Sequence, residues 1–160
     1  MYVPQRPLIK IGITPMEFFL EILSLVGILY LIVNFLESYS VISVILPLQV
    51  SASSTGGSLD PIPALLLFFA IFFYGLLTSI RIRYLHLVKY PWPITLNNAE
   101  RQYGIMRTLL SFVKVEIIWI LTVLALEAAI GLIMIAFEFV IFIILLVTLG
   151  YFMQRLSQAR

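Results

Sequence analysis

Five charged side chains lie within apolar stretches of this 160-residue chain and are its best candidates for chemistry: Glu17, Glu21, Lys114, Glu116 and Glu138. A charge inside an apolar medium is costly, so such residues usually have a function or a partner. Glu17 and Glu21 are four residues apart and share one face of a helix. Two interpretations stay open for them. Glu21 pairs with Lys114, or Lys114 reaches the membrane surface while the glutamates cap their own helix.

Glu138 is the odder case, because no basic residue is available at its expected depth, about 10 Å below the outer face of the membrane. It is either neutral and hydrogen-bonded within the bundle, in contact with another subunit, or part of an ion or proton path. Glu127 and Asn34 are its candidate neighbours in the chain.

Residues for other chemistry are scarce. The chain has no Cys and one His, and His86 falls at the edge of an apolar span, where an interfacial role is expected. No phosphate-binding glycine loop, serine-nucleophile motif or His-Glu-x-x-His element is present. The sequence therefore predicts no enzyme, no cofactor and no metal site.

The elements that carry these charges belong to a membrane protein. Hydrophobic residues make up 62% of the chain and charged residues 11%, against roughly 45–50% and about 25% in soluble domains. This composition excludes an ordinary soluble globule, a disordered chain and a typical soluble enzyme. Nucleic-acid binding is not expected, because no soluble module is available to carry it. It predicts an all-α integral membrane protein that is a single four-helix bundle in the lipid bilayer.

Four spans are expected, at about 16–36, 62–80, 108–129 and 131–153. The last two come from one apolar run that is too long for a single crossing of ~20 residues, and Gly131 is its best turn. Thr14, Pro15 and Glu17 form a capping box at the start of the first span. Asn97 with Glu100, or alternatively Thr95 with Asn98, begins a helix that runs from the cytoplasm into the third span.

Charge predicts the orientation, because retained basic loops stay cytoplasmic. All basic residues fall before the first span, between the second and third, at the base of the third, or after the fourth. Both termini and loop 81–107 are thus expected in the cytoplasm, and segment 38–61 outside. The residues expected to meet lipid headgroups are Arg6, Lys10, Arg81 and Arg83.

Two sequence blocks resemble a bacterial membrane-protein family. Thr14, Pro15, Glu17 and Glu21 match a Thr-Pro-x-Glu element with a second Glu. The second block comprises Tyr90, Pro91, Ile94, Thr95, Asn98, Ala99, Glu100, Arg101, Gln102 and Tyr103. Together they resemble the domain-of-unknown-function family related to immunity proteins against the sporulation-delaying toxin. The resemblance implies a four-helix membrane domain in the bacterial inner membrane, without a known reaction. The extracytoplasmic stretch LPLQVSASSTGGSLDP lacks the His, Asn and aromatic residues of that family.

The resulting functional prediction is a non-enzymatic protein that works through helix–helix contacts, as an accessory subunit or a homo-oligomer. An alternative is immunity or signalling, in which loop 81–107 sequesters a cytoplasmic partner. The candidate docking residues are Tyr90, Trp92, Asn98, Glu100, Arg101 and Tyr103. Membrane anchoring by the aromatic and basic residues of this loop is the simpler interpretation. Ion or proton translocation through Glu138 is a weaker alternative.

Overall fold

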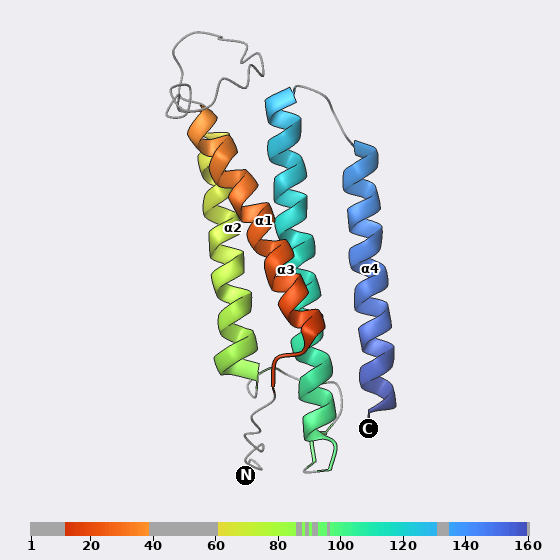
Figure 1. The fold of residues 1–160 in the computed structure, drawn as a ribbon. Coiled ribbons are helices and arrows are strands. Elements are labelled where there is room, and N and C mark those ends of the chain that lie inside the picture. The colour runs from red at the N-terminus through yellow and green to blue at the C-terminus, as the bar shows by residue number, and fades with distance from the viewer. Residues whose placement is uncertain are drawn as a thin grey trace, which may run out of the picture.

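In a computed structural model, the chain is described over residues 12–38, 61–85, 88, 90, 93–95, 97–130 and 135–159. These residues form helices α1 (Pro15–Ser38), α2 (Ile62–Ser79), η1 (Ile80–Tyr84), α3 (Ala99–Ile130) and α4 (Ile135–Gln158), and no strand occurs among them (Figure 1). Predictions for Arg6, Lys10, His86, Trp92 and the centre of segment 38–61 lie outside the described residues.

Helix α1 begins as the sequence predicts. The Thr14 hydroxyl accepts a hydrogen bond from the Glu17 backbone N–H at 3.2 Å. The Glu17 carboxylate accepts one from the Thr14 backbone N–H at 3.1 Å. This reciprocal pair satisfies two donors that the first turn of a helix would otherwise leave open. Pro15 follows at the first helical position, where its missing N–H costs nothing.

Helix α3 is a single 32-residue helix, as expected for a third span that continues from outside the membrane. At 1.5 Å per residue it is about 48 Å long, well beyond the ~30 Å hydrocarbon layer of a bilayer. Its start uses the second of the two predicted registers. The Asn98 side-chain oxygen accepts a hydrogen bond from the Thr95 backbone N–H at 2.7 Å.

The described part of α4 runs from Ile135 to Gln158, and residues 131–134 lie outside the described residues. Glu138 lies in the first turn of this described helix. The partial positive charge of a helix N-terminus favours a carboxylate at this position. The depth of Glu138 below the membrane surface stays a prediction.

Helices α1, α2 and α3 pack against one another, whereas α4 packs against α3 alone (Figure 1). Small residues bring the first three helices close together, which is common between membrane helices. A Cβ atom added at Gly27 of α1 would lie 2.7 Å from the Ile118 side chain of α3. Further along, Leu31, Ala70 and Ala125 form a shared buried cluster.

A second cluster ties the ends of α3 and α4 together. Its buried members are Tyr90, Ala99, Tyr103, Met106, Leu109, Phe152 and Leu156. The last turn of α4 thus lies beside the first turns of α3, at the same end of the bundle as the start of α1 (Figure 1). All four helices are long and apolar enough to cross a membrane. The fold is compatible with a multi-pass integral membrane protein whose apolar helix surfaces meet the lipid bilayer.

Candidate functional site: a buried charge network

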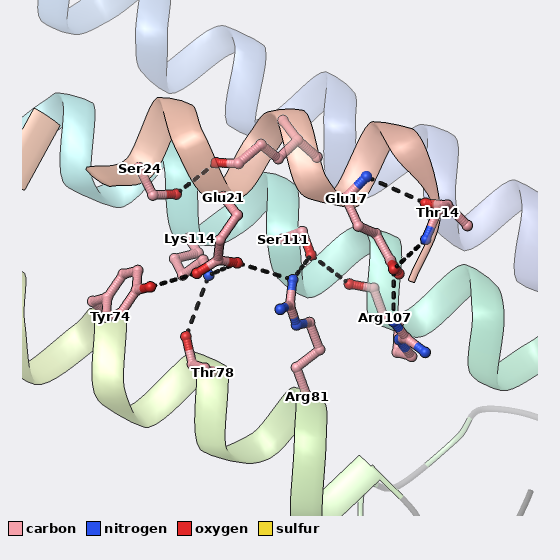
Figure 2. A network of polar contacts seen from close by, with 11 residues as sticks. Thr14, Glu17, Glu21, Ser24, Tyr74, Thr78, Arg81, Arg107, Ser111 and Lys114 are labelled. Atoms are coloured by element: carbon pink, nitrogen blue, oxygen red, sulfur yellow. Dashed lines mark hydrogen bonds and ion pairs between the residues drawn. The ribbon is translucent and has the colours of Figure 1, made fainter. Parts of the chain in front are cut away.

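Charged side chains from three helices meet inside the bundle, toward the end where α1 begins (Figure 2). Helix α1 contributes two carboxylates, Glu17 and Glu21. Arg81 comes from η1 at the end of α2, and Arg107 and Lys114 come from α3. We call these five residues the buried charge network.

Glu17 and Arg107 form the first pair. One Arg107 guanidinium nitrogen lies 2.6 Å from a Glu17 carboxylate oxygen, and both side chains are at most 10% exposed. The same oxygen accepts the Thr14 backbone N–H. Glu17 thus caps α1 and joins α1 to α3 at once.

Glu21 is the centre of the network. One of its oxygens lies 2.6 Å from the Lys114 ammonium nitrogen and 3.1 Å from an Arg81 nitrogen. Its other oxygen accepts a hydrogen bond from the Tyr74 hydroxyl of α2. The ion pair between Glu21 and Lys114, one of the two interpretations left open by the sequence, is present, and Lys114 does not reach the surface. One carboxylate thus connects three helices.

Lys114 is enclosed on all sides, with its side chain only 1% exposed. Its ammonium group donates to the Thr78 hydroxyl at 3.2 Å and stands 4.5 Å from the centre of the Tyr74 ring. Arg81 donates to the Ser111 hydroxyl at 2.9 Å, and Ser111 donates to the Arg107 carbonyl at 3.0 Å. These bonds link the two ion pairs into one connected system.

The network holds three cations and two carboxylates, a formal excess of one positive charge. Removing charges from water costs several kcal/mol per ion, and only close pairing with further hydrogen bonds offsets that cost. Every member has a charged partner within 3.1 Å. The arrangement fixes how α1, α2 and α3 sit against each other.

A separate carboxylate connects α3 to α4. Glu116 is 7% exposed, and one of its oxygens accepts a hydrogen bond from the Thr148 hydroxyl at 2.7 Å. The other oxygen is buried and has no hydrogen-bond partner. The sequence singled out Glu138 as the acidic residue without a partner, but the buried, half-satisfied carboxylate is Glu116. Glu138 is half-buried and lacks an ion pair among the described residues.

Arg81 corrects the prediction for lipid headgroups. It was expected at the membrane surface with Arg83, because both follow the second span. Its side chain is instead 9% exposed and points at Glu21 and Ser111 (Figure 2). Arg83, two residues on, is exposed. The two residues are about half a helical turn apart, so one arginine points inward and the other outward.

The predicted docking residues of loop 81–107 separate into two groups. Tyr90 and Tyr103 are buried and meet edge to face, with ring centroids 5.6 Å apart, so they belong to the core. Asn98 holds the turn before α3 through Thr95 and Pro93. Only Glu100 and Arg101 are exposed among the docking residues that the structure describes. The expectation of an aromatic docking surface is therefore corrected for both tyrosines.

Sequence reasoning missed Arg107, Tyr74, Thr78 and Ser111, although a signal was available. Each of three helices carries polar residues at positions i, i+4 and i+7, which fall on one helix face. The three sets are Glu17, Glu21 and Ser24; Tyr74, Thr78 and Arg81; and Arg107, Ser111 and Lys114. The repeated spacing predicts one polar stripe on each of three otherwise apolar helices. Such stripes are stable when they pack against one another.

Fold and network together describe a helical multi-pass membrane protein whose first three helices are joined by buried ion pairs. Comparison of the chain with protein-family models, with characterised proteins and with solved structures finds no match. The resemblance to the immunity-related family rests on the two sequence blocks and stays a prediction.

Proposed function

We propose that this chain is a non-enzymatic subunit of a membrane assembly, in which α1, α2 and α3 form a rigid unit and α4 offers a contact surface to another helix. The observation that carries the proposal is the position of α4, which packs on α3 and on no other described helix. The assembly is either a homo-oligomer or a complex with a different membrane protein.

The packing of α4 leaves most of its circumference free. Its less exposed residues recur every three or four positions and form one stripe: Glu138, Ile141, Leu145, Thr148, Phe152 and Leu156. Thr148 and Phe152 contact α3 through Glu116 and Phe112. The other flanks carry large exposed apolar side chains, among them Phe139, Leu146 and Met153. Residues spaced by seven lie on one face, which suits contact with a second helix.

Single-cysteine crosslinking tests the proposal directly, because the native chain has no Cys. Leu146→Cys places one thiol on the exposed flank of α4, and Leu25→Cys is the matched control on an exposed position of α1. In native membranes we expect a thiol-reactive crosslinker to join Leu146→Cys to a second copy or to another protein, and Leu25→Cys to remain uncrosslinked. A strictly monomeric protein in mild detergent, with no co-purifying partner and no crosslink from α4, would refute the proposal.

The immunity or signalling alternative is supported by the neighbouring exposed charges of Glu100 and Arg101 at the start of α3. It requires the bacterial inner membrane and a cytoplasmic loop 81–107. The double variant Glu100→Ala, Arg101→Ala should then lose a cytoplasmic partner in a pull-down, while Arg83→Ala keeps it. If deletion of the gene changes neither toxin sensitivity nor transcription of neighbouring genes, this alternative fails.

A further inference from the structure

A groove of about 760 Å³ runs between α3 and α4, beside the first turn of α1. Helix α3 forms one wall through Ile105 and Phe112, and α4 forms the other through Ile144, Val147 and Phe152. No described contact between α1 and α4 closes it. The groove therefore opens sideways from the bundle, between two helices that are long and apolar enough to cross a membrane.

We propose that this groove binds one anionic phospholipid, with an acyl chain along its apolar walls and the phosphate at the end that carries Arg101 and Arg155. The volume falls within the roughly 300–1,000 Å³ range of small-molecule sites. A lipid is the occupant that the surroundings supply, because the open side of the groove faces the bilayer.

Polar side chains inside the groove are hydrogen-bonded or ion-paired to other protein groups, so the walls that a ligand would meet are mainly apolar. The Thr148 hydroxyl donates to Glu116 at 2.7 Å, and the Thr108 hydroxyl donates to the Gly104 carbonyl at 3.1 Å. Glu17 is paired with Arg107. Each of these side chains turns its polar atoms toward protein partners, so an acyl chain meets carbon along most of the groove.

The charges at the open end favour a phosphate. Arg101 lies in the first turn of α3 and Arg155 in the last turn of α4, and both are exposed and line the groove. Arg155 stands over the Tyr151 ring at 5.4 Å, an aromatic–basic combination typical of the headgroup level. Glu100 is the one further unpaired charge lining this end among the described residues, so a net positive charge remains there. Guanidinium groups bind phosphate oxygens well because their donors match phosphate geometry.

Native mass spectrometry of the full chain tests the lipid site. The protein, purified in mild detergent, is mixed with equal amounts of phosphatidylglycerol and phosphatidylcholine, and the retained lipid is measured. A net single positive charge at the headgroup predicts roughly fivefold preference for phosphatidylglycerol. The double variant Arg101→Gln, Arg155→Gln leaves only the negative charge of Glu100 at this end, so the preference should fall below one. Arg83→Gln removes an exposed arginine off the groove and should keep the preference.

Two further variants test the acyl chain from opposite walls. Ile144→Trp fills the groove from α4 and Thr108→Trp from α3, and each should reduce the retention of both lipids severalfold while circular dichroism shows unchanged helix content. Lipid retention that is unchanged in both tryptophan variants would overturn the proposal. So would an equal loss of preference in Arg83→Gln, or a crosslink between two Ile144→Cys copies across the groove.

Discussion

At the scale of single residues, Glu21 is the member of the buried charge network with the most side-chain partners. One carboxylate serves Lys114, Arg81 and Tyr74, which come from α3, η1 and α2. Three cations share two carboxylates in the network. Loss of a carboxylate should therefore lower stability more than loss of a cation.

Glu21→Gln should be the most damaging change in the network. It leaves Arg81 and Lys114 without a charged partner and raises the formal excess from one positive charge to two. Breaking a buried pair from one side costs about 3–5 kcal/mol of unfolding free energy. Denaturant titration in detergent micelles measures the loss. Glu100→Gln, at an exposed site, is the control and should change stability by less than about 0.5 kcal/mol.

Lys114→Met should cost less than Glu21→Gln, even though Lys114 is the more completely buried of the two. Without Lys114, Arg81 still pairs with Glu21, and the network becomes balanced. The same unfolding titration compares the two variants. A larger loss for Lys114→Met would mean that packing around the lysine, not charge pairing, holds the three helices together.

Thr148→Val tests the polar contact between α3 and α4. The substitution keeps the shape of the side chain and removes the hydroxyl that donates to Glu116, so both Glu116 oxygens become unsatisfied. An unsatisfied buried acceptor costs about 1–3 kcal/mol. Faster amide hydrogen exchange confined to α4 is the expected result. Thr108→Val removes a hydroxyl bonded within its own helix, and exchange in α4 should then stay at the native rate.

At the scale of helices, the approach of α1 to α3 depends on the absence of a side chain at Gly27. Gly27→Ala puts a Cβ atom 2.7 Å from Ile118, so α1 or the isoleucine must shift. Overpacking of this kind costs about 1–3 kcal/mol. Gly75 of α2 has open space around it, and Gly75→Ala should instead raise stability slightly through helix propensity. Thermal unfolding of the two variants gives the comparison, and equal effects would contradict the close contact.

The four long helices could be predicted from the sequence, because each is an apolar segment long enough to cross a membrane. The Thr14–Glu17 capping box and the long α3 follow from local chemistry, so local patterns sufficed. Arg81 could not be placed by its neighbours in the chain, since Arg83 lies only two residues further on, about half a helical turn away, and points the opposite way. Glu116 was among the charged candidates, but its contact could not be predicted because its partner, Thr148, lies 32 residues away and comes from a different helix.

At the scale of the whole molecule, the even number of described helices puts the start of α1 and the end of α4 at one end of the bundle (Figure 1). We propose that this end faces the cytoplasm, on the distribution of basic residues. Ser54→Cys, in segment 38–61, should react in intact cells with a maleimide that cannot cross membranes. Gln158→Cys should react only after permeabilisation. The opposite labelling pattern would invert the proposed orientation.

The buried charge network also has a consequence for how the chain is made. Synthesis delivers Glu17 and Glu21 to the membrane first, and the partner Lys114 follows Glu21 by 93 residues. At a ribosomal rate of about 5–20 residues per second, this delay lasts roughly 5 to 20 s. Until α3 is made, Glu17 lacks Arg107, and Glu21 has Arg81 as its only base in the network. We therefore expect the first helix to settle in a membrane together with the third helix, and not on its own.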